Sequence, residues 1–185
     1  KGLRVIVMEP RPWLGGFFEY RSGEYKDRQT LHERAKYLAN EVAAHENIRL
    51  FTSTSAVGTY NNNLVTGFQI GKKEDVFDQR YIEIRAKSVV AAAGCIERPL
   101  IFDNNERPGV MQIACALRLA KTYGQIPGKK AVFSIGHDLG LEAALELHDL
   151  GLAISCIADI REDGQDPELL KKIEDKKIPL LKGWV

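Results

Sequence analysis

Two stretches of the chain repeat one pattern: a short apolar run, a turn that contains glycine, and then apolar residues at helical spacing. The first apolar run covers residues 3–9 and the second covers residues 130–135. Continuous apolar runs of this length are typical of parallel strands that are covered on both faces. A helix after each run provides the crossover that a parallel strand pair needs. The sequence therefore predicts an α/β fold with two βα blocks.

The expected elements of the first block are a helix that Thr30 caps and that ends near His45, and a strand over residues 47–51. Threonine is a preferred residue immediately before the first turn of a helix, because its hydroxyl accepts a free backbone N–H. The second block continues with a helix over residues 139–150, a strand over residues 153–158 and a helix over residues 167–177.

Between the two blocks, the pattern changes to an alternation of apolar and polar residues. Such alternation is typical of half-buried antiparallel strands, and turn-forming residues at 61–63 and 71–79 separate three such runs. We expect an antiparallel β meander over residues 53–85. A buried strand over residues 86–93, a polar stretch and a helix from about residue 109 to residue 123 should follow.

Composition excludes several classes of protein. The 185 residues are 44% hydrophobic, which excludes a disordered tail, and 26 basic against 25 acidic residues do not suggest a nucleic-acid surface. Three distant cysteines without a CxxC motif favour a reducing compartment and indicate neither a disulfide framework nor a metal site. No apolar run reaches the ~20 residues of a membrane span. We expect a soluble, cytoplasmic protein that contacts neither nucleic acid nor membrane.

The length corresponds to one complete domain or two incomplete ones. The sequence opens directly on the first strand pattern, so we expect a piece of a larger polypeptide or a split subunit. A small complete protein with an edge strand first is the alternative. We expect two partial domains, over residues 1–107 and 108–185, whose parallel strands form two sheets joined by a hinge near residues 96–108.

Glu9, at the carboxyl end of the first strand, is the first candidate binding residue. An acid there can accept hydrogen bonds from both ribose hydroxyls of an adenine dinucleotide. Gly15 and Gly16 would let the backbone approach a phosphate or a flavin ring closely. The alternative is a surface acid followed by an ordinary turn. We expect Arg11, in the same loop, and Val57, in the meander, to contact the cofactor as well.

Ala92, Ala93 and Gly94 end the strand that is expected after the meander. Small residues are needed where a chain passes against a dinucleotide. The alternative is a strand that simply ends in a glycine turn, which would have the same sequence. The order of strand, acid, glycine pair, meander and small residues favours binding of FAD. This order predicts a partial FAD-binding Rossmann-like domain with an antiparallel meander, followed by the first half of a nicotinamide-type Rossmann domain.

The second candidate site lies in the turn from Gly136 to Gly140, between a strand and a helix. Asp159 follows Gly136 by 23 residues, close to the spacing of a ribose-binding acid. However, Asp138 stands where the GxGxxG fingerprint requires glycine, and its carboxylate would repel a pyrophosphate unless it caps the helix. We expect it to cap the helix. Arg161 could instead favour a 2′-phosphate, so the sequence leaves NAD(P) binding open.

The sequence indicates no catalytic nucleophile and no metal site. The four histidines share no spacing, and neither serine nor cysteine has an ordered base beside it. Cys95 follows the small-residue turn and could approach a flavin, or it could be an idle thiol. The catalytic residues therefore stay unknown.

Several segments resemble the α subunit of heterotetrameric sarcosine oxidase and its relatives among proline dehydrogenases, hydrogen cyanide synthases and opine oxidases. The resemblance is most specific in two motifs, Glu97-Arg98-Pro99 and Arg-Pro-Gly-Val-Met at residues 107–111. It also includes the loop at residues 9–16 and the stretches at residues 124–129 and 159–161.

The resemblance implies an FAD domain that a nicotinamide-type domain interrupts. It also implies two partners, the remainder of the flavoprotein subunit and a β-type subunit that oxidises a secondary amine or an amino acid. In that family a βα unit with the FAD glycine loop precedes the first strand found here. We therefore expect the isolated chain to bind FAD poorly and to be inactive.

Two alternatives to an oxidoreductase segment of this family stay open. The chain could be a scaffold or interaction fragment that keeps the fold without a cofactor, which the broken glycine turn favours. It could also be an NAD(P)H-dependent flavin reductase of the disulfide-reductase type, although no CxxC motif supports this.

Overall fold

The computed structural model describes residues 2–21, 23 and 30–184. The contacts within the chain divide it into two compact units. The first comprises residues 1–19 and 23–94, and the second comprises residues 20–22 and 95–185. The domain boundary expected after residue 107 stays a prediction. Within the described residues, no helix combines the length and the apolar character that crossing a membrane requires.

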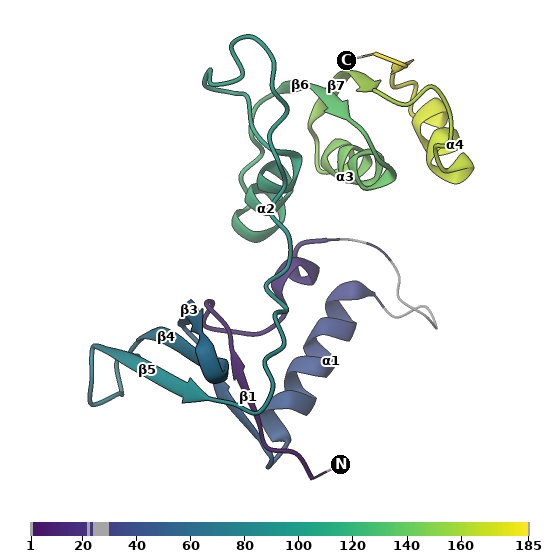
Figure 1. Ribbon diagram of the computed structural model, residues 1–185. Coiled ribbons are helices and arrows are strands. Elements are labelled where there is room, and N and C mark those ends of the chain that lie inside the picture. The colour runs from purple at the N-terminus through teal and green to yellow at the C-terminus, as the bar shows by residue number, and fades with distance from the viewer. Residues whose placement is uncertain (1, 22, 24–29, 185) are drawn as a thin grey trace. The chain divides into compact units, whose positions relative to one another are not determined.

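The first unit contains one parallel strand pair with one helix. Strands β1 (Val5–Met8) and β2 (Ile48–Phe51) pair in parallel, with Val5 opposite Ile48. Helix α1 (Leu31–Ala44) connects them (Figure 1). Thr30 caps this helix as expected: its hydroxyl accepts the Glu33 N–H at 3.1 Å, and the Glu33 carboxylate accepts the Thr30 N–H at 2.9 Å. Both free donors are thus satisfied at the point where the helix begins.

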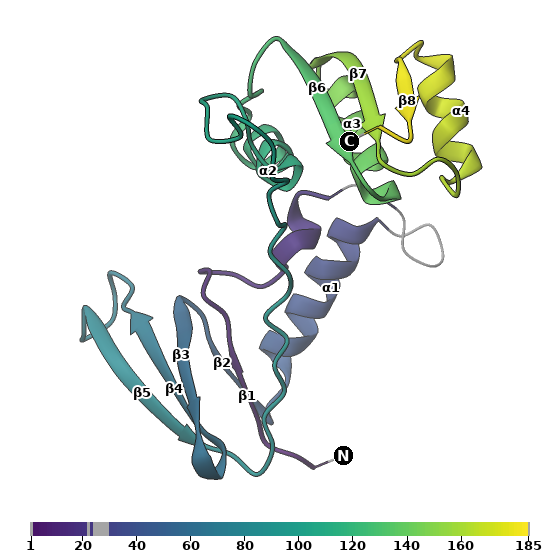
Figure 2. The ribbon, with the colours of Figure 1, turned by 45° about the horizontal axis from the view of Figure 1, so that its top comes forward.

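The expected meander follows as a separate sheet of the first unit. Strands β3 (Thr54–Tyr60), β4 (Leu64–Ile70) and β5 (Gln79–Arg85) pair antiparallel in the order β3-β4-β5 (Figure 2). Asn62 and Asn63 make the first turn with φ of 60° and 53°, a conformation that asparagine tolerates better than most residues. The pairing of β3 with β4 shifts by one residue between Ala56 and Gly58, so Val57 lies in a bulge.

The second unit contains a parallel sheet with helices. Its elements are α2 (Ile113–Tyr123), β6 (Lys130–Ile135), α3 (Asp138–Asp149), β7 (Ala153–Asp159), α4 (Pro167–Asp175) and β8 (Leu180–Lys182). The three strands pair in the order β6-β7-β8. The parallel strands of the chain therefore form two separate sheets, as expected.

The core of the second unit is built mainly on α3 and the strand beside it. Leu141 and Leu147 of α3 are fully buried, as is Ile157 of β7. Tyr20, which lies far away in the sequence, joins the same core. Next to it, Arg21 forms an ion pair with Glu142 at 2.6 Å.

Two expectations about elements were wrong, and one strand was not predicted. Residues 86–93 form no strand, and the Val90 side chain is 86% exposed, because no described strand donates hydrogen bonds to this run. Helix α2 begins at Ile113, not near residue 109. There the Glu97 carboxylate accepts the N–H groups of Ile113 and Ala114 at 3.3 and 2.8 Å. Strand β8 was not expected, because three residues carry too little pattern to predict it.

Gly140 allows α3 to approach β6 closely, and its substitution by alanine tests that contact. A Cβ at this position would lie 2.7 Å from Cγ2 and 2.9 Å from Cβ of Ile135, which is buried. Alanine normally stabilises a helix by about 1 kcal/mol relative to glycine. Because Ile135 Cβ cannot move without its strand, we expect Gly140→Ala to lower the free energy of unfolding by about 1–2 kcal/mol.

Chemical denaturation measures this change. Leu139→Ala, at an exposed position of the same helix, serves as the control and should change stability far less. A stabilising Gly140→Ala would contradict the close contact.

Candidate functional site

The candidate site of the first unit is a cavity of about 320 Å³ at the carboxyl end of β1. Glu9 follows β1 directly, and its backbone is fixed by hydrogen bonds to Phe51 O at 2.9 Å and from Thr54 N at 2.9 Å. The half-buried Glu9 side chain lines the cavity together with Gly15 and Gly16. The remaining lining is apolar and comes from the loop and from one face of α1: Leu14, Phe18, Ala35, Leu38, Ala39 and Val42.

The loop after β1 needs its two glycines. Gly15 has φ of +139° and Gly16 has φ of +56°, both in the region that residues with a Cβ rarely adopt. Arg11 fixes the loop, because its Nη1 donates to Gly16 O at 2.9 Å and pairs with Glu19 at 3.4 Å. A Cβ on Gly16 would meet nothing within 4 Å, so the backbone there borders open space.

The Glu9 carboxylate is only partly used by the protein. Its Oε1 accepts the Arg11 N–H at 3.0 Å. Among the residues that the structure describes, none donates a hydrogen bond to Oε2. A cavity of this size lies at the lower end of the range for ligand sites, ~300–1,000 Å³. The residues therefore fit one part of a dinucleotide, with a free carboxylate oxygen for a hydroxyl and a glycine backbone that a ligand can approach.

Arg11, which was also predicted to contact the cofactor, holds the loop but does not line this cavity, and four further predicted residues lie outside it. Val57 is an exposed residue in the β3 bulge, and Ala92, Ala93 and Gly94 lie in an exposed segment without regular structure. Gly94 has φ of +74°, as a glycine turn requires, but a Cβ there would contact nothing within 4 Å. The structure brings Glu9, Gly15 and Gly16 together and does not bring these four to them.

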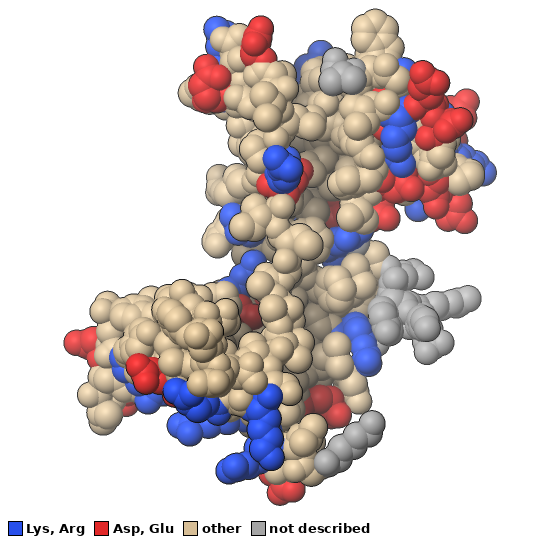
Figure 3. Space-filling view, viewed as in Figure 1, with Lys and Arg blue, Asp and Glu red and all other residues tan. Residues whose placement is uncertain are grey.

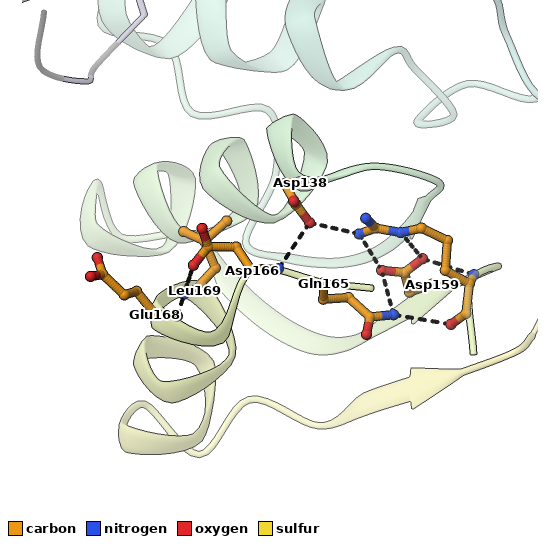
Figure 4. Close-up of polar contacts among 7 residues, drawn as sticks. Asp138, Asp159, Gln165, Asp166, Glu168 and Leu169 are labelled. Atoms are coloured by element: carbon orange, nitrogen blue, oxygen red, sulfur yellow. Dashed lines mark hydrogen bonds and ion pairs between the residues drawn. The ribbon is translucent and has the colours of Figure 1, made fainter. Parts of the chain in front are cut away.

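The candidate site of the second unit lies at the carboxyl end of β7 (Figure 4). Asp159 is the last residue of that strand, and its side chain is fully buried. Its Oδ1 accepts the N–H of Arg161 at 3.0 Å and the Arg161 Nε at 3.1 Å. Its Oδ2 accepts Arg161 Nη2 at 2.8 Å and Gln165 Nε2 at 3.4 Å. The carboxylate thus meets four protein donors.

Asp138 does not cap its own helix, so the expected role was wrong. His137 is the capping residue of α3 and makes no side-chain cap bond, while Asp138 is already the first helical residue. A capping side chain must come from the residue before the helix, so Asp138 stands one position too late. Its carboxylate instead lies 2.9 Å from Arg161 Nη2 and accepts the Asp166 N–H at 3.4 Å.

The charges of this cluster stabilise one another. Burial alone would raise the pKa of Asp159, but hydrogen bonds from the Arg161 side chain and backbone outweigh it, so the pKa falls below its usual value. The hydrogen bond to Asp159 is the main reason that the pKa of Arg161 is raised. Asp159 and Arg161 therefore both stay charged at neutral pH.

The residues of the second unit do not fit a nicotinamide dinucleotide. An ionised carboxylate offers about four acceptor positions, and protein donors use all four at Asp159. Gly136 and Gly140 pack on side chains, because a Cβ would lie 3.1 Å from Ile160 and 2.7 Å from Ile135, respectively. No group of residues suited to hold a metal occurs in the described part of the chain.

Sequence reasoning missed Gln165 and Asp166. Asp166 caps α4 by accepting the N–H groups of Glu168 and Leu169, with Pro167 at the first helical position. This Asp-Pro start is a readable signal for a helix. Nothing local in the sequence indicates that Gln165 reaches back to Asp159, because that contact depends on the tertiary path of residues 160–166.

Arg161→Ala tests the structural role of the cluster. Removing the guanidinium leaves the buried Asp159 carboxylate with fewer partners, and such losses cost about 3–5 kcal/mol when both partners are fully buried. Because the Arg161 side chain is 23% exposed, water recovers part of this energy. We expect the free energy of unfolding at pH 7 to fall by about 2–3 kcal/mol.

The pH dependence gives a second measure. The pKa of Asp159 is lowered in the folded protein, so its stabilising contribution is present at neutral pH. This contribution is lost as the pH falls below the unfolded value of about 4. Denaturation at several pH values should show that Arg161→Ala flattens this acid loss, whereas Arg118→Ala, on the exposed face of α2, leaves it unchanged. An equally steep loss in both variants would contradict the assignment.

Known proteins with similar sequences are sarcosine oxidase subunits, although no family model matches the chain. The α subunit of sarcosine oxidase from Corynebacterium sp. (strain U-96) is 29% identical over 169 residues, which cover 88% of this chain. The corresponding subunit from Rhizobium meliloti (strain 1021) is 27% identical over 166 residues, 86% of the chain. The matched stretch spans only 17% of either relative.

Solved structures with a similar fold are oxidoreductases. L-proline dehydrogenase from P. horikoshii matches with a TM-score of 0.66 and 24% identity, over 86% of this chain and 32% of that one. A NAD-dependent persulfide reductase from A. fulgidus matches with a TM-score of 0.59 and 18% identity, over 97% of this chain and 35% of that one. The chain is therefore a homologue of one part of the sarcosine oxidase α subunits, built on part of the two-dinucleotide-binding Rossmann-like fold.

Proposed function

We propose that the chain is part of an α-type subunit of a flavin-dependent oxidoreductase that acts on a secondary amine or an amino acid, and that its first unit holds the adenosine side of FAD. The observation that carries the proposal is the Glu9 cavity. A half-buried acid with one oxygen free stands at the end of a parallel strand, and Gly16, which also lines the cavity, borders open space. This position of an acid suits the recognition of ribose hydroxyls.

The roles of the residues follow from their contacts. Glu9 would accept hydroxyl hydrogen bonds through Oε2, since Oε1 is held by the Arg11 N–H. Gly15 and Gly16 would let the loop backbone lie against the ligand, and Arg11 would keep the loop in place through Gly16 O and Glu19. The apolar face of α1 would exclude water from one side of the adenosine. The flavin would supply the chemistry, a two-electron oxidation of the substrate at its carbon–nitrogen bond.

The relatives also support the proposal that this chain works with partner subunits. Their name marks them as the α subunit of a larger assembly, and the matched stretch is a small part of each. We propose that this chain works together with the remainder of a flavoprotein subunit and with a β-type subunit that oxidises the amine.

Glu9→Gln in the complete flavoprotein subunit tests the role of the acid. The change removes the negative charge but keeps the shape, so a charge-assisted hydrogen bond to ribose becomes a neutral one. We expect FAD binding to weaken by about 1–1.5 kcal/mol, the difference between a charge-assisted and a neutral hydrogen bond, measured by titrating the apoprotein with FAD and following flavin fluorescence. Glu41→Gln, on the exposed side of α1, is the matched control and should leave the affinity unchanged. Equal affinities of the two variants would refute the role of Glu9.

The 185 residues alone should be colourless after purification. A pyrophosphate binds best at a helix amino terminus, and the Glu9 cavity is lined by residues from the middle of α1, not from its start. At that start, the Glu33 carboxylate already accepts the Thr30 N–H, and the Thr30 hydroxyl accepts the Glu33 N–H. An absorption spectrum of the purified chain should therefore lack the visible flavin band. A stoichiometric flavin band would show that the phosphates find donors elsewhere and that this account of the cavity is wrong.

A further inference from the structure

We propose that Arg161 closes the dinucleotide-type site of the second unit from within, so that this unit binds neither NAD⁺ nor NADP⁺. Arg161 would then be a specificity-determining residue, because it excludes nucleotides from the second unit and leaves that unit with a structural role. The proposal goes beyond the function proposed above and does not depend on it, because every residue that closes the site belongs to the second unit.

The first step of the argument is the saturation of Asp159. The acid at this strand end would have to offer free oxygens to a ribose. Here Arg161 provides three donors, its backbone N–H, Nε and Nη2, and Gln165 provides a fourth. The side chain of Asp159 has no exposed surface. A ribose could bind only after the guanidinium leaves, and the departure would break a charge-assisted bidentate pair.

The second step is the comparison with Glu9, which shows that the closure depends on one side chain. Both acids stand at the carboxyl end of a parallel strand, both precede an arginine by two residues, and both accept its backbone N–H at 3.0 Å. The side chain of Arg11 turns away to Gly16 O and Glu19, which leaves a Glu9 oxygen free. The side chain of Arg161 folds back onto its own acid. The same local arrangement is thus open in one unit and closed in the other.

The third step is the second anchor of Arg161. Asp138, the first residue of α3, holds Nη2 at 2.9 Å and also accepts the N–H of Asp166. The cluster therefore ties the glycine turn to the start of α4. The turn presents a carboxylate where a pyrophosphate would need backbone donors, and like charges there repel.

The charge of the surroundings acts in the same direction. Acidic side chains gather over the part of the second unit that carries α4 in the view of Figure 3. Acidic residues outnumber basic ones in residues 162–175, with Glu162, Asp163, Asp166, Glu168, Glu174 and Asp175 against Lys171 and Lys172. Such a surface lowers the local concentration of an anionic dinucleotide.

The test compares the complete wild-type protein with Arg161→Gln, using NAD⁺ and NADP⁺ as the two titrants in isothermal titration calorimetry. Oxidised nucleotides avoid electron transfer to a bound flavin. We expect no saturable heat from the wild type with either titrant. Arg161→Gln keeps an amide near Asp159 but frees carboxylate oxygens, so it should gain saturable binding of NAD⁺. The gain should be at least about tenfold, the size of one charge-assisted hydrogen bond. Arg118→Gln is the matched control and should gain nothing.

Each other outcome overturns the proposal in a defined way. Saturable binding of NAD⁺ to the wild type would show that the site is open. Binding of NADP⁺ alone would show that Arg161 recognises a 2′-phosphate instead. If neither the wild type nor Arg161→Gln binds, Arg161 is not what closes the site.

Two further measurements cover the possibility that Arg161→Gln does not fold. Asp138→Gly leaves the buried Asp159–Arg161 pair intact but removes the second anchor and the carboxylate in the turn. It should increase hydrogen–deuterium exchange in both the β6–α3 turn and the start of α4, and it should still show no NAD⁺ binding, because Arg161 keeps the Asp159 carboxylate occupied. Unchanged exchange in both segments would refute the role of Asp138 as the second anchor, and NAD⁺ binding by this variant would refute closure of the site by Arg161. A loss of FAD from these variants is not expected, so the outcome is separate from that for Glu9.

Discussion

The buried carboxylate of Asp159 imposes the strictest requirement on the second unit. A charge without any exposed surface is stable in a protein only with a cation and hydrogen-bond donors against it. Arg161 and Gln165 satisfy that requirement, and the path of residues 160–166 is set by the need to bring both back to the strand end. Asp138 and the start of α4 are then fixed in turn, because both contact the same cluster.

At two strand ends of this chain, an acid is followed two residues later by an arginine, but only one of the two acids can still accept hydrogen bonds from a ligand. In the first unit the arginine after the acid is held by a glycine carbonyl and a glutamate, so the acid keeps capacity for a ligand. In the second unit the arginine has the acid itself as partner. The neighbours of the arginine thus distinguish a ligand site from a structural ion pair, and the acid alone does not.

Local patterns predicted much of the fold. Thr30 predicted the start of α1, and the polar turns at residues 61–63 and 71–79 predicted the meander. The strand expected over residues 86–93 failed because an apolar run becomes a strand only when a neighbour pairs with its backbone. The predicted start of α2 was wrong for a related reason, since its free N–H groups donate to Glu97 from 16 and 17 residues away. Of the candidate sites, the Glu9 cavity followed from local order, whereas the closure at Asp159 depends on side-chain directions that no spacing reveals.

Tyr20 and Arg21 give the second unit a discontinuous boundary along the chain. Tyr20 is buried in the core of that unit, and Arg21 pairs with Glu142 of α3, although the rest of the unit begins only at Cys95. A single cut in the polypeptide therefore cannot release this unit whole. Any recombination or truncation that separates the chain at residue 95 would leave a cavity in the core of the fragment that begins there. The other fragment would carry the Tyr20 side chain without the core that buries it. Because the second unit includes Tyr20 and Arg21 from the other part of the sequence, exchange of either unit alone between related proteins is disfavoured.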